Sequence, residues 1–254
     1  MTLNDHPLVP SGRQEAKVVL VTGASSGIGA ATARLLAKGG HRLILGARRQ
    51  ERLAVLIDEI RRDGGTATSR ALDVTERGEV AAFVDAAVEE HGRVDVMINN
   101  AGVMPLSRLD ELLVHEWDRM IDVNVRGLLH GIAATLPHFQ RQGFGHFVTV
   151  ASIGAHQVSP TAAVYCGTKY AAWAITEGLR LEVDPSIRVT TVSPGVVESE
   201  LAESITDPAA QQAMRVYRAH AIPAEAIARA VLFAVEQPDD VDVNELVVRP
   251  TRQR

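Results

Sequence analysis

The segment 164–171 carries a tyrosine and a lysine four positions apart, Tyr165 and Lys169, within a stretch that has the character of a helix. On a helix this spacing places both side chains on one face. A phenol has a pKa of about 10 in water, and a nearby ammonium lowers that pKa because it favours the phenolate. The pair could therefore exchange a proton with a substrate oxygen as a general acid and base. The same spacing also occurs on solvated helix surfaces, so other motifs must decide between the two interpretations.

A second candidate site is a glycine-rich turn that follows the first predicted strand, residues 17–22. The turn has glycines at positions 23, 27 and 29, and an alanine- and leucine-rich helix is predicted after it, at 30–38. Glycines let a ligand approach the backbone closely, and the N-terminus of a helix presents free N–H groups to an anion. Strand, glycine-rich turn and helix in this order therefore predict a phosphate-binding site.

Two arginines, Arg48 and Arg49, stand at the end of the second predicted strand, residues 42–47. In a dinucleotide-binding fold, an acidic residue at this point binds the 2′-hydroxyl of NAD, whereas a basic residue accommodates the 2′-phosphate of NADP. The chain has no acidic residue there, which favours NADP. The alternative is a solvated pair of arginines that only opens the next helix.

Strand and helix patterns alternate along the chain and position these residues. This alternation predicts an α/β fold, with one domain built on a parallel sheet that helices cover on both faces. Ligands of such sheets bind beyond the carboxyl ends of the strands, where we expect Asp73, Asn100, Gly102 and Ser152. The predicted strands are 17–22, 42–47, 66–74, 94–98, 145–151, 188–192 and 245–248; the predicted helices are 30–38, 50–63, 76–91, 116–140, 164–182 and 224–237, with a candidate mobile lid at 198–220.

Charge and composition exclude several classes of protein. The formal net charge is −5 and the basic residues are scattered, so no nucleic-acid-binding surface is expected. No apolar run approaches the roughly 18 residues that span a bilayer, and the nine histidines show no metal-ligand spacing. Residues 1–16 lack the apolar core of a signal peptide and are interpreted as a flexible leader before a domain at 17–254. The single cysteine, Cys166, cannot form an internal disulfide, and we expect a cytoplasmic protein.

Six motifs in this order resemble those of the short-chain dehydrogenase/reductase family, in its compact single-domain branch. They are Thr-Gly-x-x-x-Gly-x-Gly at 22–29, Asn-Asn-Ala-Gly at 99–102, Asn124, Ser152, Tyr-x-x-x-Lys at 165–169 and Pro-Gly at 194–195. Ser152 precedes Tyr165 by thirteen positions, which is typical of the family. The resemblance implies a doubly wound, seven-stranded parallel sheet (a Rossmann fold), hydride transfer with a nicotinamide cofactor, and usually a homotetramer.

The resemblance also implies a role for each matching residue. Tyr165 would exchange the proton with the substrate oxygen, Ser152 would hydrogen-bond that oxygen, and Lys169 would hold the nicotinamide ribose and lower the pKa of Tyr165. Asn124 would hold a water that feeds a proton relay through Lys169. The remaining positions would bind NADP(H): the diphosphate at Gly23, Ser25, Ser26, Gly27, Ile28 and Gly29, the 2′-phosphate at Arg48 and Arg49, the adenosine at Asp73, Val74, Asn100, Ala101 and Gly102, and the carboxamide at Pro194, Gly195 and Val197.

The expected reaction is hydride transfer between NADP(H) and a carbonyl compound or a primary or secondary alcohol. The Tyr–Lys spacing differs from the longer spacing of enoyl reductases with the same fold, which argues against C=C reduction. The segment 243–251 looks like a sub-branch that includes NADP-dependent 3-hydroxy acid dehydrogenases. The alternative is a non-catalytic NADP(H)-sensing or scaffold protein on this fold; such proteins typically lose the tyrosine or the lysine, and both are present here.

Overall fold

The computed structural model describes residues 15–253, which are built around a seven-stranded parallel sheet. Its strand order is β3-β2-β1-β4-β5-β6-β7, so the order reverses between β1 and β4. A crevice forms at such a reversal, beyond the carboxyl ends of the strands. The strands are β1 (Val18–Thr22), β2 (Arg42–Ala47), β3 (Thr66–Ala71), β4 (Val96–Asn99), β5 (Gly145–Val150), β6 (Ile187–Pro194) and β7 (Glu245–Val248). The predicted doubly wound, seven-stranded sheet is thereby confirmed.

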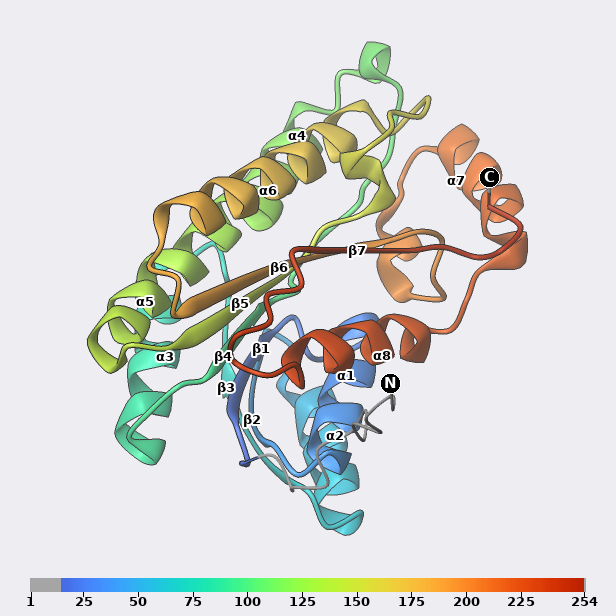
Figure 1. Cartoon of the computed structure of the whole chain (residues 1–254). Helices are drawn as coiled ribbons and strands as arrows, with labels where there is room; N and C mark the ends of the chain where they lie inside the picture. The colour runs from blue at the N-terminus through green and yellow to red at the C-terminus, as the bar shows by residue number, and fades with distance from the viewer. Residues whose placement is uncertain (1–14, 254) are drawn as a thin grey trace, which may run out of the picture.

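Helices cover both faces of the sheet (Figure 1). One layer consists of α1 (Gly27–Lys38), α2 (Gln50–Arg62) and α8 (Ala224–Val235). The other layer consists of α3 (Arg77–His91), α4 (Val114–Ile121), α5 (Gly127–Gln142) and α6 (Ala163–Glu182). The candidate lid forms α7 (Pro208–Tyr217) between two 3-10 turns, η4 (Glu200–Ser204) and η5 (Arg218–His220), and α7 lies apart from both layers, on the side where the chain ends (Figure 1).

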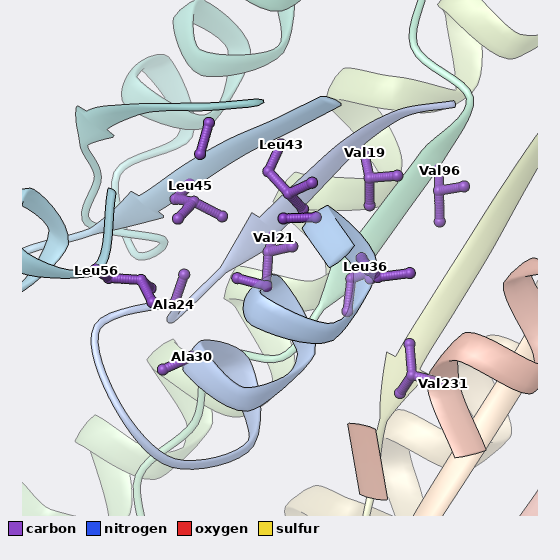
Figure 2. Packing of buried hydrophobic residues seen from close by; sticks show 14 of the residues in the cluster. Val19, Val21, Ala24, Ala30, Leu36, Leu43, Leu45, Leu56, Val96 and Val231 are labelled. Atoms are coloured by element: carbon purple, nitrogen blue, oxygen red, sulfur yellow. The ribbon is translucent and has the colours of Figure 1, made fainter. Parts of the chain in front are cut away.

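The core consists of two apolar layers, one on each face of the sheet. All five residues of β1 are buried, which explains why its first four residues, 18–21, are all apolar. Successive side chains of a strand point to opposite faces: Val19 and Val21 pack in the cluster that contains Leu36 of α1, as Figure 2 shows, whereas Leu20 packs in the cluster on the opposite face.

The predicted helix 116–140 is wrong in one respect, because a π-helical turn, η2 (Asp122–Arg126), divides it into α4 and α5. The N–H of Gly127 donates to the carbonyl of Asp122, five residues earlier, which makes this turn one residue wider than an α-helical turn. A Cβ at Gly127 would lie 2.8 Å from Cγ2 of Val74, so the helix approaches the loop after β3 closely here. Asn124 lies within the π-turn.

Other predicted boundaries differ from the observed ones by only a few residues, but these shifts affect residues of the predicted site. The helix predicted at 30–38 starts at Gly27, so the glycine-rich turn is tighter than expected. The strand predicted at 66–74 ends at Ala71, which leaves Asp73 and Val74 in a loop. The leader expected at 1–16 lies outside the described residues except for its last two positions.

Candidate active site

A cavity of about 780 Å³ opens at the carboxyl ends of the strands. It brings together residues that are far apart in the chain, from Gly23 to Arg218. Of the residues predicted to be catalytic or to bind the cofactor, all line this cavity except Gly29 and Asn124: Gly23, Ser25, Ser26, Gly27, Ile28, Arg48, Arg49, Asp73, Val74, Asn100, Ala101, Gly102, Ser152, Tyr165, Lys169, Pro194, Gly195 and Val197.

The glycine-rich turn forms one wall of the cavity and fits an anionic group. Gly23 has a φ of +67°, and a Cβ there would lie 2.7 Å from the Cα of Ala101. Gly29 packs behind the turn, where a Cβ would lie 2.5 Å from the carbonyl oxygen of Gly23. The side chain of the N-cap residue, Ser26, does not bond to the first turn of α1. The helix N-terminus is therefore free to bind a diphosphate through its N–H groups.

Hydrogen bonds join this turn to the loop after β4. The hydroxyl of Thr22 accepts from the N–H groups of Asn100 (3.1 Å) and Ala101 (3.2 Å) and donates to the carbonyl of Ile98. In return, the side-chain amide of Asn100 donates to the carbonyls of Thr22 and Gly23. These hydrogen bonds fix the glycine-rich turn and the loop after β4 relative to each other, because the buried backbone groups of each segment find their partners on the other segment.

Arg49 faces the turn, whereas Arg48 is more exposed. The Arg49 guanidinium donates to the hydroxyls of Ser25 (3.3 Å) and Ser26 (2.7 Å). The side chain of Arg48 is 61% exposed, and its nearest acidic partner is Asp73, at 3.9 Å. The interpretation of the arginines as a solvated pair therefore fits Arg48 better than Arg49.

Two residues at this end of the cavity were not predicted from the sequence. Glu200, in η4, binds Arg49 (2.8 Å) and also accepts from Arg52 of α2. Arg52 could have been suspected, since it lies in the first turn of the helix predicted at 50–63, directly after Arg48 and Arg49. Glu200 carries no such signal, because it is 151 positions from Arg49 in the chain.

Ser152, Tyr165 and Lys169 converge where β5 meets α6. Ser152 follows the end of β5, accepts a hydrogen bond from the N–H of Gly154 (3.0 Å), and lies close enough to the phenol of Tyr165 to lower the pKa of that phenol. Lys169 donates from Nζ to the carbonyl of Val150 (3.0 Å), and Nζ lies 5.9 Å from the centre of the Tyr165 ring. Both Tyr165 and Lys169 are buried, with 8% and 6% exposure.

The expected effect of Lys169 on Tyr165 is not seen. Burial raises the pKa of Tyr165 to about 12, and the hydrogen bond with Ser152 offsets this only in part. Burial also lowers the pKa of Lys169 to about 8. The prediction that the ammonium lowers the pKa of Tyr165 is therefore wrong for this structure, since removal of the phenol from water dominates its pKa and Lys169 is not among the groups that shift it. Tyr165 is protonated at neutral pH, which is the form that can donate a proton.

Asn124 lies behind Lys169 and does not reach the large cavity. Its side chain accepts from the N–H of Val103 (2.8 Å) and donates to the carbonyl of Val103 (3.0 Å) and to the hydroxyl of Thr168 (3.1 Å). Asn124 and Lys169 both line a second cavity of about 10 Å³, which is close to the space that one water molecule needs. The arrangement fixes the loop after β4 beside the amine.

The opposite end of the cavity is closed by the segment after β6 and by the lid. Gln253, which was not predicted, accepts from the N–H of Val196 (3.0 Å) and donates to the phenol oxygen of Tyr217 in α7 (2.5 Å). The walls near Tyr165 are mostly apolar, and they include Val103, Met104, Leu106, Ala162, Ala213 and Met214.

Within residues 15–253, no group of three or more histidine, cysteine, aspartate or glutamate side chains is placed to hold a metal ion. In the same part of the chain, no helix has the length and apolar character needed to cross a membrane.

A parallel sheet with a glycine-rich turn at its order reversal is the architecture of a dinucleotide-binding α/β protein. A serine, a tyrosine and a lysine lie at the same rim of this sheet. Residues 17–210 match the family described as short chain dehydrogenase. The chain therefore belongs to the short-chain dehydrogenase/reductase family, as the sequence motifs indicated, and it is an oxidoreductase of that family.

Relatives and solved structures resemble this chain along most of its length. An uncharacterised oxidoreductase of Staphylococcus saprophyticus is 46% identical over 240 residues, which cover 93% of this chain and 97% of the relative. An alcohol dehydrogenase from the archaeon Thermococcus sibiricus, solved with 5-hydroxy-NADP, is 34% identical, with a TM-score of 0.84 and coverage of 94% of this chain and 99% of that one. A short-chain dehydrogenase/reductase of Burkholderia phymatum, solved with NAD, is 26% identical, also with a TM-score of 0.84, and covers 91% of this chain and 88% of its own.

Proposed function

We propose that this protein transfers a hydride between NADP(H) and a carbonyl compound or a primary or secondary alcohol, with Tyr165 as the general acid and base. The observation that carries the proposal is the convergence of Ser152, Tyr165 and Lys169 on one wall of the cavity, where Ser152 Oγ and the Tyr165 ring both lie next to Gly154, each 3.4 Å from the position of a Cβ there. Two hydroxyls placed side by side in this way can bind one substrate oxygen together.

Each residue of the site would have a separate role in this reaction. The nicotinamide, when bound, supplies or accepts the hydride. Ser152 holds the carbonyl oxygen, and Tyr165 gives it the proton, which suits the raised pKa of this phenol. Lys169 holds the ribose hydroxyls and stands between Tyr165 and the small cavity at Asn124. A single water there would connect Lys169 to a proton relay, with Asn124 as the residue that positions the loop.

NADP(H) is the preferred cofactor in this proposal because three arginines, at positions 48, 49 and 52, surround the carboxyl end of β2 and no acidic residue follows that strand directly. A 2′-phosphate is a dianion that guanidinium groups bind through charge-assisted hydrogen bonds. The Thermococcus sibiricus relative was solved with an NADP derivative and the Burkholderia phymatum relative with NAD, so the arginines, rather than the family, carry this choice.

The test is an assay of the purified chain with NADPH and NADH against a panel of aldehydes and ketones, and with the oxidised cofactors against the matching alcohols. The panel should favour apolar substrates, because the walls near Tyr165 are mostly apolar. Turnover with NADPH is expected for at least one member. Tight binding of NADPH without turnover on any member would instead favour the non-catalytic sensor or scaffold, which the intact Ser152, Tyr165 and Lys169 do not favour.

We also propose that the protein assembles as a homotetramer, or alternatively as a homodimer, in the cytoplasm. The outer helices and the edge strand β7 carry large apolar side chains that a monomer would leave in water, which is characteristic of an interaction surface. They are Val114, Ile121, Leu129, Tyr170 and Leu181 on one side of the molecule and Phe233 and Val247 on the other. Light scattering after size-exclusion chromatography measures the mass, and a monomer at micromolar concentration would contradict the proposal.

A further inference from the structure

Glu200 is a carboxylate placed where the arginines at the cavity meet. One of its oxygens accepts from Nη1 of Arg49 at 2.8 Å, and the other accepts from Nη1 of Arg52. The hydrogen bonds from Arg52 and Arg49 hold the pKa of Glu200 below its usual range, so it is an anion at neutral pH. The residue belongs to η4, the first turn of the lid segment.

All three nitrogens of the Arg49 guanidinium are engaged in this arrangement. Nε and Nη2 donate to the hydroxyls of Ser25 and Ser26, and Nη1 donates to Glu200. A 2′-phosphate bound at the end of β2 would need the same guanidinium as a donor, because Arg49 is the arginine that faces the glycine-rich turn. Glu200 and the 2′-phosphate would thus bind the same guanidinium groups, and the two anions would repel each other if both were bound to them.

We propose that Glu200 competes with the 2′-phosphate of NADP(H) for Arg49 and Arg52, and so sets how strongly the protein prefers NADP(H) over NAD(H). The inference rests on the proposed use of these arginines for cofactor binding. Binding of NADP(H) requires Glu200 to give up its contacts with the arginines, whereas NAD(H), which has no 2′-phosphate, leaves them in place. The preference for NADP(H) is therefore smaller than the three arginines alone would produce.

Glu200→Gln tests the competition, because it keeps the shape of the side chain and removes its charge. The probes are 2′,5′-ADP and 5′-AMP, which differ only in the 2′-phosphate, and calorimetry measures the Kd of each. The matched control is Glu198→Gln: Glu198 is exposed, lies two positions away, and forms no ion pair within residues 15–253. Thermal unfolding of all three proteins verifies that each variant is folded.

Glu200→Gln is expected to lower the Kd of 2′,5′-ADP about tenfold, which corresponds to about 1.4 kcal/mol, and to leave the Kd of 5′-AMP within twofold. The NADPH-to-NADH ratio of kcat/KM should rise by the same factor, and Glu198→Gln should change neither value. An unchanged or higher Kd of 2′,5′-ADP in Glu200→Gln would overturn the competition.

The two proposals fail in different ways. If the unmodified protein binds 2′,5′-ADP no tighter than 5′-AMP, its proposed preference for NADP(H) is refuted. The proposed competition can still be tested in that case. It predicts that Glu200→Gln binds 2′,5′-ADP more tightly than 5′-AMP, although the unmodified protein does not. A variant that binds both ligands equally well would refute the competition.

Discussion

Lys169 donates a hydrogen bond to the backbone carbonyl of Val150 at 3.0 Å, and this contact joins the middle of the active site to the end of β5. The amine is only 6% exposed, and burial lowers its pKa to about 8. The single carbonyl thus replaces only part of the hydration that the ammonium would have in water. The position of Lys169 is therefore maintained at a cost in stability.

Lys169→Met is expected to abolish turnover and yet stabilise the fold at pH 7. The folded chain binds the lysine proton less tightly than the unfolded chain, with a pKa of about 8 against 10.5. The unfolding free energy of the unmodified protein therefore rises as the pH increases from 8 towards 10.5. The variant should be more stable by about 1–3 kcal/mol at pH 7, and this difference should shrink by pH 9.5. Urea unfolding at both pH values measures it.

Lys38→Met is the control, because Lys38 is exposed in the last turn of α1. Its unfolding free energy should change by less than about 0.5 kcal/mol at either pH. If Lys169→Met is less stable than the unmodified protein at pH 7, the ammonium stabilises the fold and our account of its burial is wrong.

The two directions of the reaction should respond to pH in opposite ways. Carbonyl reduction needs the protonated phenol of Tyr165, and its pKa of about 12 keeps it protonated throughout the neutral range. Alcohol oxidation needs the phenolate, so its kcat/KM should rise with pH between 7 and 10. Reduction should be nearly constant from pH 6 to 7.5 and should fall above about 8, where Lys169 loses its charge. An oxidation rate that is highest near pH 6 would contradict this assignment.

Tyr165→Phe removes only the hydroxyl that transfers the proton. A general acid contributes about 10²–10⁴-fold to the rate, so kcat should fall by at least 100-fold. The Kd of NADPH, measured by fluorescence, should stay within about threefold, because the ring still fills the same part of the cavity wall. Substantial residual turnover would assign the proton transfer to another group.

Arg48→Asp should weaken NADPH more than NADH, because it removes a cation and adds repulsion near the 2′-phosphate. The KM of NADPH should rise at least tenfold and that of NADH less than threefold. Arg42→Asp serves as the control, since Arg42 is exposed at the opposite end of β2. Equal effects of Arg48→Asp on both cofactors would mean that Arg49 and Arg52 hold the phosphate without Arg48.

Thr22→Val should destabilise the fold by about 1–3 kcal/mol, because two backbone N–H groups, those of Asn100 and Ala101, would lose their acceptor. Thr32→Val is a matched control: the Thr32 side chain is also buried, but within residues 15–253 its hydroxyl has no hydrogen-bond partner. That variant should be neutral or stabilising. Equal losses in both variants would show that shape, and not hydrogen bonding, matters at Thr22.

The parts of the protein that could be predicted from the sequence are those with local signals. Buried parallel strands have unbroken apolar runs, as at residues 18–21, and the glycine-rich turn is marked by its own residues. The family motifs supplied the serine, tyrosine and lysine, and the fold brings all three to one cavity. These features depend on neighbours in the chain or on patterns that many proteins share.

The features that were missed depend on contacts between distant segments. Glu200 reaches Arg49 only because the lid packs over the end of β2, and Gln253 reaches Tyr217 only because the chain returns to the cavity after β7. The pKa of Tyr165 was predicted in the wrong direction because the spacing of two residues says nothing about burial, which here dominates. The π-turn at 122–126 was missed because an extra residue does not disturb the apolar pattern on either side.

The π-turn has a consequence for how this region tolerates insertions and deletions. Removing one residue from 122–126 would allow α4 and α5 to merge into a regular helix, and each residue of an α-helix turns by about 100°. The N–H of Gly127 would then bond to the carbonyl of Asp122 across four positions instead of five, so Gly127 would keep its close contact with Val74. The residues within the turn would rotate instead, and Asn124 would lose its hydrogen bonds to Val103 and Thr168. We therefore expect sequences related to this one to vary in side chains here while keeping the length of the segment constant.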